Sequence, residues 1–254
     1  MLRMKNAFLS SIMLLAAVCA AALAQTKSAP APAAKSAPKA GAPKAATKAK
    51  AGPNLLDPST LNAKAPPVYL VKLNTTKGPI VIRVTKNWAP IGADRFYNLV
   101  RAGFYNNNVI FRSTKQFAQF GIPSRPEISR VWMEHTMFDD RPIQSNKRAM
   151  VTFASTGDKN SRSVQVFISK VDNGYLDSMG FAPFGEVIEG LDNLDMLYTG
   201  YGEQVTNLQG EIMNQGNAFL EKNFPRLDKI TTAVIEPLPA EPPKDEAKKD
   251  DAKQ

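Results

Sequence analysis

The chain has 254 residues, a formal net charge of +9 at pH 7, one cysteine and one histidine. The only thiol, Cys19, and the only imidazole, His135, leave little material for a cysteine-ligated metal centre, a histidine-rich zinc site or a Ser-His-Asp triad. The sequence also has no Gly-Lys dipeptide, which excludes a P-loop phosphate site. We therefore expect no metal site.

Residues 1–24 have the pattern of a secretory signal peptide. Arg3 and Lys5 precede an uncharged run from Ala7 to Leu23, and small residues stand at its end. A membrane anchor is the alternative, but the apolar run is short for a span. We expect an exported protein, periplasmic or secreted, that has no stable membrane span once the signal is removed.

Residues 25–53 form a linker of Ala, Pro, Lys, Ser and Thr with six lysines and no acid. Such a segment cannot bury enough apolar surface to offset chain entropy, so we expect it to be disordered. It is either a plain spacer or an arm that makes weak contact with anionic envelope polymers. Residues 237–254 are predicted to be a second disordered tail. Because the basic charge lies in the linker, we expect no nucleic-acid partner.

The remaining residues, 54–236, are enough for one domain. Their first part predicts a hairpin of strands 68–73 and 79–84, joined by a turn at 75–78. A helix is predicted from Pro90 to Arg101, with Gly103 as its stop. The pattern then predicts several short strands, two more helices and a closing strand. The strands are near 109–112, 117–121, 149–154, 165–169 and 184–188, the helices at 191–198 and 211–223, and the closing strand at 229–235.

The most informative segment is 110–121, which places one arginine, Arg112, in an aromatic-rich stretch. Phe117 and Gln119 follow it, and residues two apart in a strand face the same way. A guanidinium, an amide and a phenyl ring can then line one apolar groove. No acid, thiol or histidine accompanies them. The set suits a site that binds and polarises a peptide group without covalent chemistry.

Four segments together, in order and spacing, resemble the cyclophilin-type peptidyl-prolyl isomerases. The segments are Asp94–Tyr105, Phe111–Gly121, Phe153–Ile168 and Tyr175–Gly190. The resemblance implies a mainly β fold, a closed eight-stranded antiparallel barrel capped by two or three helices. It also implies cofactor-free isomerase activity on proline-containing polypeptides. We expect a monomer that assists the folding of exported proteins.

The resemblance also assigns roles to single residues. Arg112 takes the position of the catalytic arginine, and Gln119 that of the glutamine beside it. The substrate-binding positions are Phe117, Phe167 and Leu176 in the proline pocket, Phe153, Ala154 and Ser155 in the loop that holds the substrate backbone, Gln165 as a second glutamine, and Tyr175 and Phe181 in the pocket wall. Tyr175 stands where the family has a tryptophan that supports tight cyclosporin binding, so weak inhibition is expected.

The sequence departs from the family pattern within the site. There is one residue fewer between Arg112 and Gln119, and one more between Gly157 and Gln165. These changes keep an alternative open, namely a catalytically weak module of the same fold that binds proline-containing segments. A structural envelope protein is a third interpretation. The presence of Arg112, Gln119 and Gln165 together favours the isomerase.

Overall fold

The computed structural model describes residues 53–238. The signal peptide predicted at 1–24, all but the last residue of the predicted linker and most of the predicted tail lie outside the described residues. Within them, no helix has the length and apolar character needed to cross a membrane.

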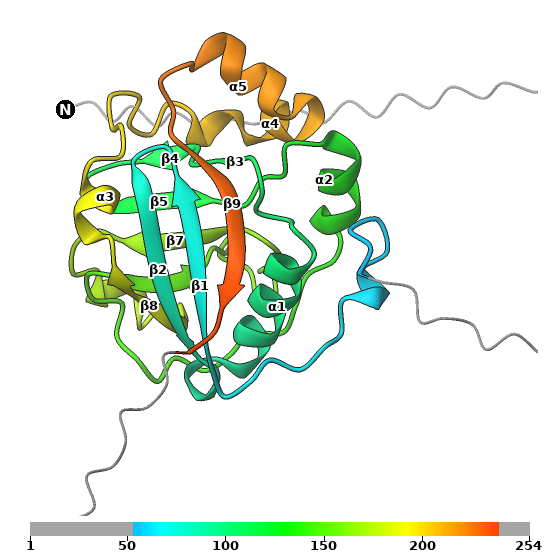
Figure 1. Cartoon of the computed structure of the whole chain (residues 1–254), viewed down its shortest axis with the longest axis vertical. Coiled ribbons are helices and arrows are strands. Elements are labelled where there is room, and N and C mark those ends of the chain that lie inside the picture. The colour runs from blue at the N-terminus through cyan, green and yellow to red at the C-terminus, as the bar shows by residue number, and fades with distance from the viewer. Residues whose placement is uncertain (1–52, 239–254) are drawn as a thin grey trace, which may run out of the picture. The chain divides into compact units, whose positions relative to one another are not determined.

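Among residues 53–238, nine strands form one antiparallel sheet that curls into a half-barrel (Figure 1). The strand order is β3-β9-β1-β2-β8-β6-β7-β5-β4. The strand bounds are β1 Val68–Thr75, β2 Gly78–Thr85, β3 Asn108–Val109, β4 Arg112–Ser113, β5 Phe117–Phe120, β6 Met150–Phe153, β7 Val166–Ser169, β8 Pro183–Glu189 and β9 Lys229–Glu236. The predicted hairpin is confirmed, with Thr75 paired to Gly78 at the turn.

The mainly β fold expected from the sequence is confirmed, but the closed eight-stranded barrel is not: the described residues form a half-barrel of nine strands. The single strand predicted at 109–112 is two short strands, β3 and β4, which lie at opposite ends of the strand order. In the described part of the chain these two edge strands do not pair with each other. Of the two residues between them, Ile110 is buried in the main core and Phe111 in a second core.

Five α-helices are present among the described residues, rather than two or three. They are α1 Pro90–Arg101, α2 Pro126–Met133, α3 Leu191–Asp195, α4 Gln209–Gln215 and α5 Asn217–Asn223. The predicted helix 211–223 is divided by Gly216, which has φ 65° and lies so close to the Ser124 carbonyl that a Cβ would sit 2.1 Å from that oxygen. Only glycine adopts this conformation at such a close approach.

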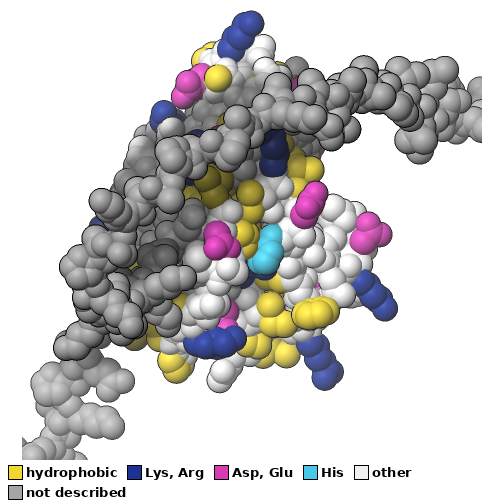
Figure 2. All heavy atoms as spheres, turned by 90° about the vertical axis from the view of Figure 1, so that its right-hand side faces the viewer, with side chains coloured by type: hydrophobic (Ala, Val, Ile, Leu, Met, Phe, Trp, Pro, Cys, Tyr) yellow, Lys and Arg dark blue, Asp and Glu magenta, His cyan; other side chains and the backbone are white. Residues whose placement is uncertain are grey.

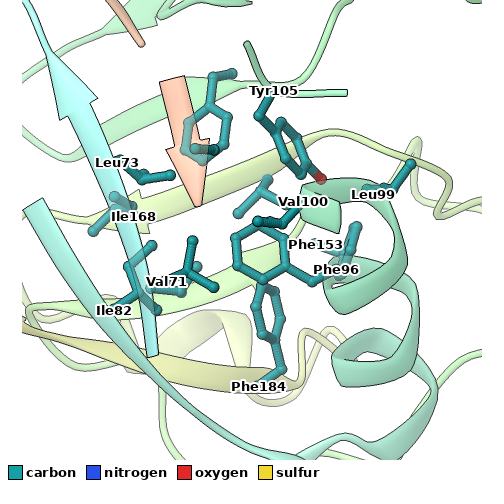
Figure 3. Packing of buried hydrophobic residues seen from close by; sticks show 14 of the residues in the cluster. Val71, Leu73, Ile82, Phe96, Leu99, Val100, Tyr105, Phe153, Ile168 and Phe184 are labelled. Atoms are coloured by element: carbon teal, nitrogen blue, oxygen red, sulfur yellow. The ribbon is translucent and has the colours of Figure 1, made fainter. Parts of the chain in front are cut away.

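The main core lies between the sheet and α1 (Figure 3). Phe96, on α1, packs against Phe184 of β8 with ring centroids 5.0 Å apart. Helix α1 begins at Pro90, and two of its first backbone N–H groups donate to the Asp140 carboxylate at 3.1 and 2.8 Å. A carboxylate at a helix N-terminus satisfies N–H groups that have no partner in the helix and complements the helix dipole.

The second core lies at the end of the sheet where α4 and α5 are seen in Figure 1. Its buried residues are Val109, Phe111, Ile122, Val205, Ile212, Leu220 and Phe224. This core fixes the segment between α3 and α4 against the strands β3 and β4. The segment thereby lies next to Ser113 of β4, with which Gly202 forms an antiparallel bridge.

Candidate active site

Three site residues form a row across three neighbouring strands. Arg112 of β4 lies directly opposite Gln119 of β5, and Gln119 lies directly opposite Phe167 of β7. Directly opposed residues of paired strands project from the same face. Phe117 is two residues before Gln119 and shares that face. The predicted grouping of guanidinium, amide and phenyl groups is therefore present.

A chain of side-chain hydrogen bonds connects the polar groups of this row. Arg112 Nη1 donates to Gln119 Oε1 at 3.1 Å, and Gln119 Nε2 donates to Gln165 Oε1 at 2.9 Å. Gln165 Nε2 in turn donates to Gln209 Oε1 at 2.8 Å. Because each amide uses both of its ends, the orientation of every member depends on the next.

A carboxylate that the sequence did not indicate contacts the guanidinium. Glu203 accepts from Arg112 Nε at 2.8 Å through Oε2 and from Nη2 at 2.7 Å through Oε1. Thr206 Oγ1 also donates to Glu203 Oε2 at 3.0 Å. The hydrogen bonds from Arg112 hold the pKa of Glu203 below its usual range, against the opposite effect of partial burial.

An apolar cluster adjoins the guanidinium. Phe117, Phe167 and Leu176 are buried together, with Ala154 and Phe181 packed against them. The rings of Phe117 and Phe167 meet edge to face with centroids 5.3 Å apart. Arg112 Cζ lies 4.9 Å from the centroid of the Phe117 ring, within the range of a cation–π contact. A cationic donor therefore borders a small apolar surface of the kind that would take a pyrrolidine ring.

A pocket of about 340 Å³ lies beside the amide chain. It shares Gln119, Gln165 and Ala154 with the site, and Ser155 lines it as well. Its other walls come mainly from α2, α4 and the loop after β5, with Trp132, Met133, Met213, Ile122 and Ser163 among them. Figure 2 shows the face of the molecule that carries the histidine, with hydrophobic, acidic and basic side chains spread over it. The site thus has an apolar cluster and a separate pocket, joined by the glutamines.

The family model for the cyclophilin type peptidyl-prolyl cis-trans isomerases matches residues 70–216, more than half of the chain. The chain belongs to this family. An isomerase of Acinetobacter baylyi is 29% identical over 133 residues, covering 50% of this chain and 71% of its own. Peptidyl-prolyl cis-trans isomerase B of Escherichia coli is 29% identical over 136 residues, covering 50% and 83%.

Solved structures of the family are also similar to this cyclophilin. A crystal structure of a Cryptosporidium parvum cyclophilin type isomerase aligns with a TM-score of 0.49 and 19% identity. The alignment covers 68% of this chain and 99% of that one.

The loop residues assigned from the resemblance divide into two groups in this cyclophilin. Ala154 and Ser155 line the pocket, and the Ala154 N–H donates to the Gln165 carbonyl at 2.9 Å. The side chain of Phe153 instead belongs to the main core, where its ring centroid is 5.0 Å from that of Phe184. Only the backbone of Phe153 is therefore available to a substrate.

The two wall positions also differ from each other. Phe181 packs against the apolar cluster, with its ring centroid 5.8 Å from that of Phe167. Tyr175 is 55% exposed and lies in the short 3-10 helix Gly174–Leu176 at the edge of this cluster. The tyrosine thus borders the apolar cluster but is not one of its buried residues.

Sequence reasoning missed Glu203 and Gln209, which contact Arg112 and Gln165. Both come from the segment between α3 and the first turn of α4, which is far along the chain from the strands that it contacts. The sequence carries no periodic pattern that would place either side chain. Among the described residues, no group of three or more His, Cys, Asp or Glu side chains is arranged to hold a metal ion.

Proposed function

We propose that this cyclophilin isomerises X-Pro bonds in proline-containing polypeptides by using Arg112 to stabilise the twisted amide. The observation that carries the proposal is the position of Arg112 over the edge of the Phe117–Phe167–Leu176 cluster, hydrogen-bonded to Gln119. The apolar cluster would hold the pyrrolidine ring. The guanidinium would then lie next to the peptide bond that turns.

The chemistry requires no proton transfer. Amide resonance opposes rotation about the X-Pro bond with a barrier of about 20 kcal/mol. At the top of the barrier the prolyl nitrogen is pyramidal and has recovered its lone pair. A donor directed at that lone pair stabilises the twisted state more than either planar state, which is the requirement for catalysis. Arg112 supplies such a donor because its charge is permanent.

Gln119 and the apolar cluster support this step in different ways. The Gln119 amide accepts from Arg112 and donates to Gln165, and its second N–H could donate to the substrate carbonyl. Phe117 and Phe167 exclude water from the ring-binding surface, and a drier surrounding strengthens the field of the guanidinium. The pocket beside the glutamines can accept a neighbouring side chain of the peptide.

The cellular part of the proposal comes from the sequence. The signal-like residues 1–24 support a role in folding exported proteins, in the periplasm or outside the cell. The six lysines of 25–53 support weak contact with anionic envelope polymers. Cell fractionation tests the first point. A pull-down on envelope material at low and high salt, with and without 25–53, tests the second, because screening weakens such contacts.

The catalytic proposal is tested with Arg112→Ala in an isomerase assay on an X-Pro peptide. We expect a loss of kcat/KM of at least about a hundredfold, the usual effect of removing a donor to the transition state. Arg130→Ala is the matched control, because Arg130 is exposed on α2 and outside the site. Full activity of folded Arg112→Ala would reject the mechanism. An inactive wild type that still binds proline peptides would favour the binding module.

A further inference from the structure

The segment from the end of α3 to the first residue of α4 delivers two side chains to the Arg112–Gln119–Gln165 chain of hydrogen bonds. Glu203 binds Arg112 side-on, through Nε and Nη2, and Gln209 accepts from Gln165 at 2.8 Å. The two side chains thus meet the two ends of the Arg112–Gln119–Gln165 chain. Neither residue was assigned a role by the family resemblance.

This segment is held firmly where it contacts Arg112. Gly202 forms an antiparallel bridge with Ser113, the residue after Arg112 on β4. Val205 is fully buried in the second core. Thr206 donates through its backbone N–H to the Glu203 carbonyl at 3.1 Å and through its hydroxyl to the Glu203 carboxylate at 3.0 Å. The backbone on both sides of Glu203 is therefore fixed, and so is the Cα atom from which its side chain projects.

The side-on pair leaves a defined part of the guanidinium free. An arginine has five N–H donors, one on Nε and two on each Nη. Glu203 takes the Nε donor and one on Nη2, and Gln119 takes one on Nη1. Two donors remain, one on each Nη atom. Arg112 can therefore direct two N–H groups at a substrate while its other three keep it in place.

We propose that Glu203 is a positioning residue for isomerisation, which fixes the Arg112 guanidinium so that its free Nη donors face the twisted amide. The proposal rests on the catalytic role proposed for Arg112. The Arg112 side chain is 25% exposed and is attached to a strand of only two residues at the sheet edge. Without Glu203, its long side chain would sample several rotamers, and only some of them would aim a donor at the prolyl nitrogen.

The geometry favours positioning over competition with the substrate. A carboxylate that took the terminal Nη1–Nη2 edge would use up the Nη donors that are left here to Gln119 and a substrate. Glu203 instead occupies the Nε–Nη2 edge, and its own side chain is 54% exposed. Because an ion pair this exposed adds little to stability, its removal should leave the fold intact. The effect should therefore be seen in catalysis rather than in unfolding.

The test compares Glu203→Gln with wild type in kcat, KM and the 15N–1H spectrum of arginine Nε groups. We expect kcat to fall about tenfold, since misplacing a catalytic group lowers the rate strongly, while KM is unchanged. The Arg112 Nε–H signal, identified by its absence in Arg112→Ala, should lose its exchange protection. Glu203→Asp, which keeps the charge, should recover part of kcat. Glu211→Gln, which removes an exposed charge on α4, is the matched control and should equal wild type.

Two results would overturn the proposal. Unchanged kcat in Glu203→Gln would mean that the ion pair does not position Arg112, and increased kcat would mean that Glu203 competes with the substrate. Arg112→Ala, measured alongside, separates this failure from that of the proposed function. If Arg112→Ala is inactive while Glu203→Gln equals wild type, only the positioning role is rejected. If Arg112→Ala is fully active, the mechanism itself is rejected.

Discussion

Gln119 lies directly opposite Arg112 across the β4–β5 pair, and its one amide connects Arg112 to Gln165. Its oxygen accepts from Arg112 Nη1 at 3.1 Å, and its nitrogen donates to Gln165 Oε1 at 2.9 Å. The side chain is almost fully buried. A buried amide with both ends hydrogen-bonded has only one orientation. The positions of Arg112 and Gln165 are therefore coupled through Gln119.

We predict that Gln119→Leu lowers both activity and stability. Leucine keeps a similar volume but leaves Arg112 Nη1 and Gln165 Oε1 without this partner, at a cost of about 1–3 kcal/mol in the free energy of unfolding. The loosened guanidinium should reduce kcat/KM by about ten- to a hundredfold. Denaturant unfolding and a peptide isomerase assay measure the two effects. Gln116→Leu, at an exposed position of the preceding turn, is the control. Wild-type activity in Gln119→Leu would show that the Gln119 side chain is not needed for catalysis.

The second prediction is that the Phe153 side chain contributes to the stability of the core and not to catalysis. Its side chain packs in the main core beside Phe184 and is 2% exposed. Phe153→Leu should therefore lower the free energy of unfolding by about 1–2 kcal/mol through lost packing, with kcat/KM of the folded protein unchanged. Phe138→Leu is the control: Phe138 is 74% exposed, and the change should stay within about 0.5 kcal/mol. A loss of activity in Phe153→Leu without a loss of stability would show that this side chain contributes to the substrate site.

The elements predicted from the sequence are those whose signals are local. Helix α1 was predicted with its observed bounds because Pro90 marks its start and Gly103, with φ 71°, follows its end. The shared face of Phe117 and Gln119 follows from strand alternation alone. Helix α2 has an equally local signal, a proline at its first position, but its pattern is too short to stand out: only Ile128 and Trp132 mark its buried side.

The features that were missed depend on contacts between distant parts of the chain. Glu203 is 91 residues from Arg112 in sequence, and Gln209 is 44 residues from Gln165. Their segment is placed by Val205 in the second core, and that core also contains Phe111 and residues of α4 and α5. The break at Gly216 likewise depends on the Ser124 carbonyl, which a sequence pattern does not reveal.

A third prediction concerns inhibition by cyclosporin. Tyr175 is 55% exposed at the edge of the apolar cluster, and a tyrosine lacks the indole N–H and the larger ring of tryptophan. We expect weak inhibition of the wild type and clearly tighter inhibition of Tyr175→Trp, with peptide isomerisation little changed. Inhibitor titrations of both proteins measure this. Tyr198→Trp is the control, because the Tyr198 ring contacts Tyr201 and Arg226 and is not part of the cluster. Tight binding by the wild type would show that position 175 is not the determinant.

The last prediction concerns the pH dependence of stability through Asp94. Its carboxylate accepts from the Ala65 N–H at 2.8 Å and pairs with Lys86 at 2.7 Å and Lys64 at 3.0 Å. Burial alone would raise the pKa of Asp94, but the hydrogen bonds from Lys86, Ala65 and Lys64 outweigh it and lower the pKa. Asp94 thereby ties the segment before β1 to helix α1.

A carboxyl whose pKa is lower in the folded state stabilises the protein fully above its unfolded pKa, which is about 3.9. That contribution disappears as the pH falls through the lower, folded pKa. Asp94→Asn should therefore be less stable than wild type at neutral pH, and the two unfolding curves should converge as the pH falls below about 4. Urea unfolding across this range measures the difference. Glu221→Gln, at an exposed position of α5, is the control and should follow the wild-type curve throughout. A difference between Asp94→Asn and wild type that stayed constant with pH would mean that Asp94 acts through shape and hydrogen bonding and not through its charge.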